Sequence, residues 1–350
     1  MKKIWKNKTT RKNLVTYLFV ILAYVILQSL AAGGGMKASL KGMLVPICAY
    51  VVMALSLNLV VGISGELSLG HAGFMSVGAF TGVTAAIALQ GLIASAPLRL
   101  CIAMLVGALF AAIAGFLIGI PVLRLNGDYL AIVTLAFGEI IKSIFNNLYV
   151  GLDSKGFHIS LLEDKTHLLE GGKLIIAGPM GIGGIQKIAT FTAGFILILV
   201  CLFVIFNLVN SRSGRAIMAI RDNRIAAESV GIPVTRYKML AFVLSAAMAG
   251  AAGTLFALNY STVVANKFDF NTSILVLVFV VFGGLGNMLG SIIAAAVLTI
   301  LPEALRGFAA YRMLIYAIVL ILVMLATNSP RIKALLPRLI PGRKGEDSHG

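Results

Sequence analysis

Five ionisable side chains lie within or directly beside apolar runs of the sequence: Glu66, His71, Asp128, Glu139 and Lys142. An unpaired charge is costly inside a lipid bilayer, so each is a candidate contact for a solute or an ion. Each also has a structural alternative. Asp128 can cap the helix that follows it, and His71 can bond to backbone carbonyls. Glu139 and Lys142 are three residues apart, so on a helix they can neutralise each other.

Glycine interrupts the apolar runs at two places. The first break, GISGELSLGHAG, spans residues 62–73, and the second break, GGLGNMLG, spans residues 283–290. Irregular backbone at membrane depth must be buried in protein or line a wet cavity, because lipid offers it no hydrogen bonds. Transporters place such broken helices at their substrate sites. The residues expected near a translocated solute are Ser64, Gly65, Glu66, Ser68, His71, Glu139, Gly283, Gly284 and Asn287.

Signatures of catalysis are absent from the sequence. It contains no GxxxxGK[ST] loop that could hold ATP phosphates, no HExxH and no GxSxG. Its four histidines are scattered. Cys48, Cys101 and Cys201 each lie alone in an apolar run, where cysteine typically serves as a small buried hydrophobic residue. We therefore expect a protein that is not an enzyme and that binds neither a metal nor a cofactor.

The elements that position these residues are predicted to be membrane-spanning helices. The chain has 350 residues, of which 59% are hydrophobic and 12% charged, and its mean hydropathy is +0.98. A water-soluble domain needs more polar side chains than this to cover its surface. The apolar runs are also too long for the strands of a membrane barrel. The predicted fold is an all-α polytopic membrane protein with about eight to ten transmembrane helices.

Because about 20 apolar residues are needed to cross the hydrocarbon core, ten spans are predicted. They cover residues 14–32, 43–62, 72–90, 99–120, 129–149, 189–210, 239–260, 272–286, 288–303 and 311–327. The two pieces within 272–303 are short, so one interrupted span with a re-entrant turn is an alternative that gives eight or nine crossings. Glycines four residues apart, such as Gly78 with Gly82 and Gly115 with Gly119, predict helices that pack closely.

Positive charge is concentrated in three segments. The chain has 29 Lys and Arg against 13 Asp and Glu, a net charge of +16. The basic clusters lie beside spans, which marks the cytoplasmic face and favours anionic lipid rather than nucleic acid as their partner. We predict cytoplasmic termini at 1–13 and 328–350, a transmembrane domain at 14–327, a charge-balanced external loop at 150–188 and a cytoplasmic loop at 211–238.

The loop at 211–238 has helical character, which a simple connection does not need. On one helix, Arg221, Arg224 and Glu228 would share a charged stripe. The opposite side is made of small and aliphatic residues: Ala216, Ile220, Ala227 and Val230. A short helix with a charged stripe and an apolar docking face predicts contact with another protein in the cytosol.

Five segments, in this order, resemble one known family. They are SGELSLGHAGFMSVGAF (64–80), GDYLAIVTLAFGEI (127–140), GPMGIGGI (178–185), SGRAIMAIRDNRIAAESVGI (213–232) and FGGLGNMLGSIIAA (282–295). From about residue 40 to residue 327 the chain resembles the LivM-type permease of high-affinity branched-chain amino acid ABC transporters. The resemblance implies a bacterial inner-membrane importer. An external solute-binding protein would deliver the solute, a second, LivH-like permease would complete the pore, and two ATPase subunits would use ATP.

The resemblance also implies how the loop at 211–238 meets an ATPase. The corresponding loop of ABC importers has a Glu-Ala-Ala pattern with a glycine four residues after the second alanine. Ala226, Ala227 and Gly231 match that spacing, whereas Ile225 stands where the pattern has glutamate. Together with the charged stripe, the predicted coupling residues are Arg221, Arg224, Ala226, Ala227, Glu228 and Gly231.

Two alternatives share parts of this pattern. Permeases for urea, short amides or simple sugars have the same architecture, although the apolar character of both breaks favours an aliphatic solute. An ion-driven secondary transporter with Glu66 or Glu139 as its proton or sodium site would also use broken helices. Such a carrier would not need the helical loop at 211–238.

Overall fold

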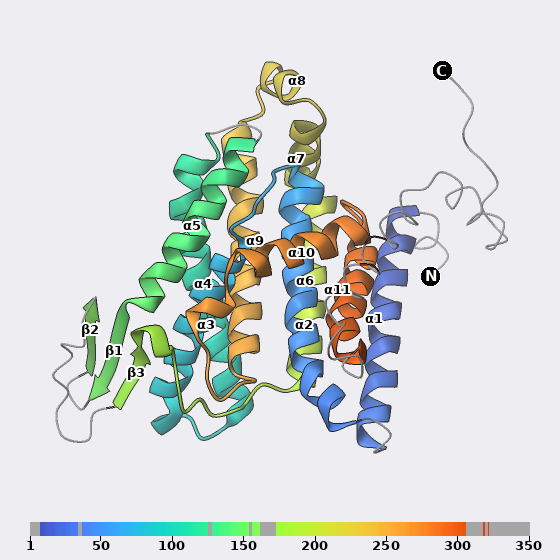
Figure 1. The fold of residues 1–350 in the computed structure, drawn as a ribbon. Helices are drawn as coiled ribbons and strands as arrows, with labels where there is room; N and C mark the ends of the chain where they lie inside the picture. The colour runs from blue at the N-terminus through green and yellow to red at the C-terminus, as the bar shows by residue number, and fades with distance from the viewer. Residues whose placement is uncertain are drawn as a thin grey trace. The chain divides into compact units, whose positions relative to one another are not determined.

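The computed structural model describes residues 8–33, 37–124, 128–153, 156–161, 173–305, 318 and 321. These residues are almost entirely helical (Figure 1). The α-helices are α1 (Lys8–Ala32), α2 (Ala38–Asn58), α3 (His71–Ala88), α4 (Ala96–Val122), α5 (Asp128–Asn146), α6 (Phe191–Asn210), α7 (Arg212–Asp222), α8 (Arg224–Ser229), α9 (Val234–Ala257), α10 (Phe270–Gly283) and α11 (Met288–Ala304). The shorter helical elements are the π-helix η2 (Leu59–Ser64) and the 3-10 turns η3 (Leu89–Gly91), η4 (Gly178–Met180) and η5 (Ala265–Lys267).

Within the described ranges, eight helices are long and apolar enough to cross a membrane. They are Asn13–Ala32, Ala38–Ser64, His71–Gly91, Ala96–Val122, Tyr129–Asn146, Phe191–Asn210, Val234–Ala257 and Ala265–Gly283. A shorter apolar helix follows at Met288–Glu303. The predicted span at 311–327 lies outside the described residues except for positions 318 and 321. The prediction of a polytopic helical membrane protein is confirmed.

Close packing of α3, α4 and α9 forms the core. The chain divides into two compact units, Met1–Ala296 and Val297–Gly350, and this core lies in the first. Gly78 of α3 lies directly against the backbone of Gly250 of α9, and Gly115 of α4 lies against Ala246 of α9. Thr254 Oγ1 donates to Gly78 O (2.7 Å) and so ties α9 to α3. The predicted role of these glycines in close helix packing is confirmed.

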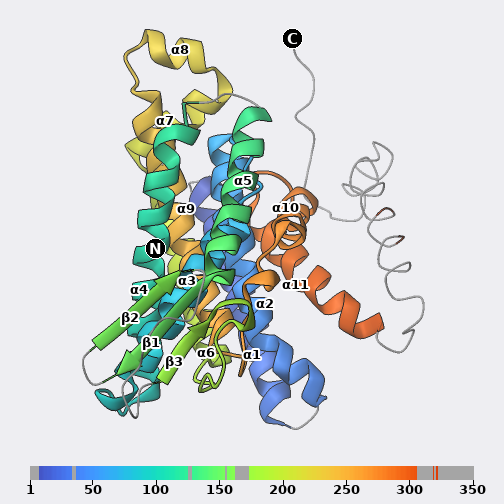
Figure 2. The same ribbon diagram turned by 60° about the vertical axis from the view of Figure 1, so that its left-hand side comes forward.

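A small antiparallel sheet occupies part of the predicted loop at 150–188. Its strands are β1 (Leu148–Asp153), β2 (Gly156–Leu161) and β3 (Lys173–Ala177), in the order β2-β1-β3. Figures 1 and 2 show this sheet at the opposite end of the helices from α7 and α8. The end that carries α7 and α8 is called the loop end, and the other the sheet end. The sequence pattern did not predict the sheet, and β1 begins inside the predicted span at 129–149.

Backbone hydrogen bonds connect the region of the sheet to the segment that leads into α10. Ile182 N donates to Val263 O (2.9 Å), and Val263 N donates to Ile182 O (3.0 Å). Ile182 also forms a bridge with Ile176 of β3. The chain between α9 and α10 is therefore fixed to the sheet by main-chain contacts, which do not depend on side-chain identity.

Candidate translocation and coupling site

The first break begins with a widened helical turn. Leu59–Ser64 form the π-helix η2 at the end of α2, and Gly65 ends it with a left-handed backbone (φ 76°). Residues with side chains rarely adopt that conformation, so glycine is required here. Glu66 N donates to Val60 O (3.0 Å), and the chain is then irregular until α3 begins. The predicted interruption is confirmed.

The two breaks meet at Gly62 and Gly286. A methyl group added to Gly62 would collide with Asn58 Oδ1 and with the backbone nitrogen of Gly286. Asn58 is fully buried in α2. Its Oδ1 accepts a hydrogen bond from Gly286 N (2.8 Å), and its Nδ2 donates to Ser291 Oγ (2.9 Å). Asn58 therefore joins the breaks. Sequence reasoning missed it, although an amide inside an apolar span is a signal that could have found it.

The other candidates of the second break form the turn between α10 and α11. Gly283 lies against the backbone of Gly290 and Ser291. Gly284 has a left-handed backbone (φ 89°), and Asn287 N donates to Gly284 O (2.9 Å). These contacts account for a tight turn at the C-terminal end of α10, and a role in solute contact stays a prediction.

Glu66 of the first break forms an ion pair with Lys238 of α9. The side chains are only 12% and 10% exposed, respectively. Charges this far from water need a partner, because an isolated buried charge costs several kcal/mol. The sequence placed Lys238 among the basic residues of the 211–238 loop but did not pair it, since 172 positions separate it from Glu66.

Arg221, the penultimate residue of α7, contacts the same break. Its Nη1 donates to Gly62 O (3.0 Å), while its Nε and Nη2 donate to Asp222 Oδ1 (3.1 and 2.9 Å). The aliphatic part of the side chain covers Gly65, where an added Cβ would lie 2.6 Å from Arg221 Cγ. The end of α7 therefore packs directly onto the first break.

Three other candidates of the first break are buried. His71 is 1% exposed, and its Nε2 shares a hydrogen bond with Ser56 Oγ (2.7 Å) and lies 3.5 Å from Ser245 Oγ. These contacts hold α3 against α2 and α9. The hydroxyls of Ser64 and Ser68 are also buried, and they have no hydrogen-bond partner among the described residues. His71 Nδ1 has no partner among the described residues either. Buried polar groups are normally paired, so all three residues stay candidates for contact with a polar solute.

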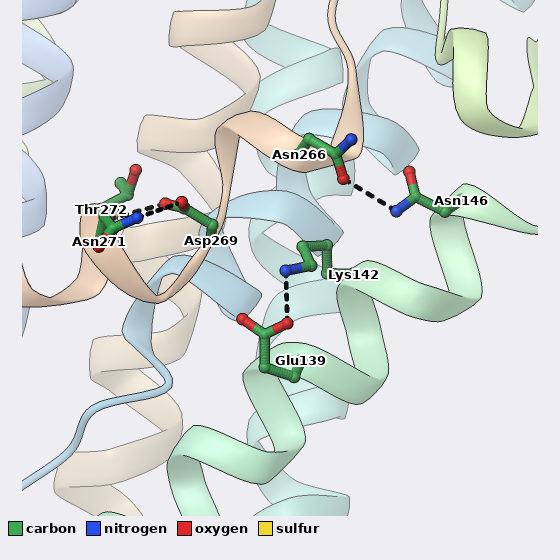
Figure 3. Close-up of polar contacts among 7 residues, drawn as sticks. All are labelled: Glu139, Lys142, Asn146, Asn266, Asp269, Asn271 and Thr272. Atoms are coloured by element: carbon green, nitrogen blue, oxygen red, sulfur yellow. Dashed lines mark hydrogen bonds and ion pairs between the residues drawn. The ribbon is translucent and has the colours of Figure 1, made fainter.

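Glu139 of α5 forms an ion pair with Lys142 and keeps 44% of its side chain exposed (Figure 3). It also lines a narrow cavity next to the first break, which in this conformation has no room for a water molecule. Residues of the first break, of α5 and of the beginning of α10 line this cavity: Leu69, Gly73, Leu135, Gly138, Glu139, Phe268, Asp269, Phe270 and Ser273. The structure thus brings Glu139 and the first break to one cavity.

The start of α10 provides the third wall of that cavity. Asp269 caps the helix, with Oδ1 accepting from Thr272 N and Oδ2 accepting from Asn271 Nδ2 (2.9 Å each; Figure 3). Ser273 Oγ accepts from Ala72 N (3.1 Å) and so connects α10 to α3. Sequence reasoning missed this contribution. The interruption of the chain that faces the cavity is the segment before α10, whereas the second break faces Gly62.

The predicted single helix in the loop at 211–238 is two helices. α7 ends at Asp222, and Asn223 caps α8 by accepting a hydrogen bond from Ala226 N at its Oδ1 (3.0 Å). Arg221 and Arg224 therefore lie on different helices. Arg221 pairs with Asp222, and Arg224 Nε pairs with Glu228 Oε1 (2.9 Å). The prediction of one continuous charged stripe was wrong.

The predicted apolar docking face was also wrong in part. Ile220, Ala227 and Val234 form a buried cluster with Ile232 and Tyr237 packed against it. The reason is the change of direction at Asn223 and at Gly231 (φ 80°), which folds α8 back so that Ala227 faces α9. The large apolar side chains that α8 and its end expose are Ile225 and Val230, at 80% and 74%. Ala226 and Glu228 lie on the exposed side as well.

A comparison with known protein families identifies the architecture. The family described as branched-chain amino acid transport system / permease component matches residues 39–324. The chain belongs to this family. The permease is 38% identical over 305 residues to the high-affinity branched-chain amino acid transport system permease protein LivM of Salmonella typhimurium and to that of Escherichia coli. Each match covers 84% of this chain and 69% of the relative.

A more distant relative is named for a different solute. The permease is 27% identical over 244 residues to the fructose import permease protein FruG of Bifidobacterium longum, a match that covers 67% of each chain. No solved structure matches the chain. The family confirms the resemblance to LivM-type permeases, so this chain is the membrane-embedded, non-catalytic component of a transporter with several parts.

Proposed function

We propose that this permease imports branched-chain aliphatic amino acids across a bacterial inner membrane as one subunit of an ATP-driven transporter. Its partners would be a second, LivH-like permease, an external solute-binding protein, and two ATPase subunits that bind and hydrolyse the ATP. The chain itself would bind no cofactor. The proposal is supported by the identity to the two LivM proteins and by the build of the loop at 211–238.

The exposed side of α8 is the observation that supports an ATPase partner best. Ile225 and Val230 extend into solvent, while Ala227 holds the helix against α9. Burying such side chains is favourable, at about 1.5–3 kcal/mol each. A soluble partner with an apolar groove would supply that burial, which is the usual mode of helix recognition. Because α7 and α9 flank α8 directly, a partner that moves α8 would also move the spans.

The loop end is proposed to be cytoplasmic and the sheet end external. Arg212, Arg215 and Arg236 are exposed at the loop end, and basic side chains beside spans favour the cytoplasmic side. The basic segments 1–13 and 328–350 would then be cytoplasmic too. The sheet end would receive the solute-binding protein.

The solute path is proposed to run along the first break, where the narrow cavity would have to open to admit a solute. The unpaired hydroxyls of Ser64 and Ser68 belong to the same break but do not line that cavity, and they would meet polar groups of the solute once it opens. Leu69, Leu135 and Phe270 at the cavity would suit an aliphatic side chain. An ion-driven mechanism is less well supported, since Glu66 and Glu139 already have lysine partners, which neutralise a carboxylate that a proton or sodium ion would need.

The test is to express the permease with its neighbouring subunits and reconstitute the purified assembly in liposomes. ATP-dependent uptake of labelled leucine, with fructose and urea as competitors, would support the proposal. Uptake of labelled fructose without uptake of leucine would assign a sugar instead. Uptake that needs an ion gradient and no ATPase would overturn the proposal.

Two variants, each with one added cysteine, test in the same assembly whether the exposed side of α8 contacts an ATPase. Ala226→Cys is expected to crosslink to an ATPase and to react with thiol reagents only from the cytoplasmic side. Leu92→Cys is the matched control, because Leu92 is 82% exposed and follows η3, after the C-terminal end of α3. It should give no such crosslink and react only from outside. The reverse pattern would invert the proposed orientation.

A further inference from the structure

Two contacts fix the first break to both flanks of α8. On one side, Arg221 at the end of α7 donates to Gly62 O (3.0 Å). On the other, Lys238 near the start of α9 pairs with Glu66. Only Asn223 separates α7 from α8, and the short turn after α8 leads directly into α9. Any displacement of α8 therefore acts on the first break through these two contacts, which are called the Arg221–Gly62 arm and the Glu66–Lys238 arm.

The Glu66–Lys238 arm differs from the other ion pairs of this loop. Its side chains are at most 12% exposed, whereas those of Arg224 and Glu228 are 39% and 50% exposed. Exposed pairs contribute little, because water screens them and their side chains remain free to move. A nearly buried pair is held together, since separating it would leave two charges without water or a partner. This arm is therefore stiff.

The receiving end of these contacts is irregular backbone. Gly62 lies in the π-helix η2, and such widened turns are typical of functional segments of helices. Gly62 also lies against Gly286, and Asn58 joins the two by its hydrogen bond to Gly286 N. A shift of Gly62 therefore reaches the second break without passing through a regular helix.

We propose that Gly62, Glu66, Arg221 and Lys238 form a latch that sets the conformation of both breaks according to the position of α8. Arg221 and Lys238 are then positioning residues for transport, and they need not touch the solute. The latch rests on the proposed function, because α8 must be moved by an ATPase. With the latch intact, hydrolysis depends on delivery of solute to the breaks. With it broken, the ATPases cycle without that signal.

The experiment uses the complete reconstituted transporter and compares ATP hydrolysis with and without solute-loaded binding protein. Lys238→Met and Glu66→Gln each break the latch. Coupling between sites typically amounts to a factor of about 5 to 150, so hydrolysis without loaded binding protein should rise at least about fivefold. More ATP should be hydrolysed per solute transported. The reversed pair, Glu66→Lys with Lys238→Glu, should return both values toward wild type, which a role of Glu66 in direct solute contact would not produce.

Two further variants keep the test independent of folding defects. Arg236→Met removes an exposed positive charge two residues from Lys238 and should leave the hydrolysis ratio unchanged. Arg221→Met keeps the aliphatic cover of Gly65 but loses the hydrogen bond to Gly62 O, so it should also raise unstimulated hydrolysis. It serves in place of the Lys238 and Glu66 variants if these fail to assemble.

The outcomes separate the latch from the function on which it rests. One outcome would overturn the latch alone. In it, the latch variants co-purify with their partners at wild-type yield, and their ratio of ATP hydrolysis with and without loaded binding protein stays at the wild-type value. A wild-type assembly whose uptake does not depend on ATP would overturn both the proposed function and the latch.

Discussion

α7 and α8 are neighbours in the sequence and in the fold, yet they are held in different ways. α7 is fixed by contacts within the chain, because Ile220 is buried and Arg221 donates to the first break. α8 buries Ala227 but leaves Ile225 and Val230 exposed. The comparison agrees with the proposal that α8 contacts a partner and that α7 passes the movement of α8 on to the first break.

The largest effect that would sharpen this comparison is expected from Ile220→Ala. It empties part of the cluster that Ile220 forms with Ala227 and Val234, and such changes cost about 2–5 kcal/mol. Val230→Ala is the matched control, since Val230 is 74% exposed and its truncation should change stability by less than about 0.5 kcal/mol. Thermal unfolding of the purified permease in detergent measures both. Equal losses of stability in the two variants would contradict the distinction between α7, which is packed within the chain, and α8, which is exposed to a partner.

A smaller effect is expected from Gly231→Val. Gly231 has φ 80° and open space around it, so the change causes backbone strain of about 1–2 kcal/mol but no collision. The strain should turn α8 away from its seat on α9, lowering leucine uptake while hydrolysis continues. Gly231→Asn is the control, because asparagine tolerates this conformation. Unchanged uptake in the valine variant would show that the direction of α8 is not important for coupling.

The smallest effect is expected from Arg224→Gln, which breaks the pair with Glu228 on α8. These side chains are 39% and 50% exposed, so the loss of stability should stay below about 1 kcal/mol. Leucine uptake should fall more than stability if α8 contacts an ATPase. A loss of stability as large as that of Ile220→Ala would mean that α8 is part of the packed core, and the comparison with α7 would fail.

The sequence was sufficient to predict both breaks and eight of the ten proposed spans, because these depend on local composition. Twenty apolar residues form a span whatever surrounds them, and Gly65 at φ 76° is the kind of position that only glycine fills easily. The partner of Glu66 was not predictable in this way. Lys238 follows 172 positions later, and the basic character of its own loop explained it well enough without a partner.

The prediction for the loop at 211–238 was wrong for a different physical reason. Its apolar pattern identified Ile220 and Ala227 as one face, but a pattern cannot tell whether the face packs on the same chain or on another. Asn223 was the overlooked signal, because asparagine inside a helical pattern favours a cap and hence a new helix. The sheet was missed because β1 begins at the end of an apolar run that was assigned to a span, and the residues after it were interpreted as a charge-balanced loop.

The paired main-chain bonds between Ile182 and Val263 have a consequence for the far side of the molecule. A displacement of β3 would pass through these bonds to the segment before α10. That segment leads to Asp269 and Ser273, which form one wall of the cavity. A protein that bound to the sheet would therefore be able to change the conformation of the cavity wall through backbone contacts alone. Most substitutions at Ile182 or Val263 would leave these main-chain bonds intact, whereas a proline at either position would remove one of the two donors.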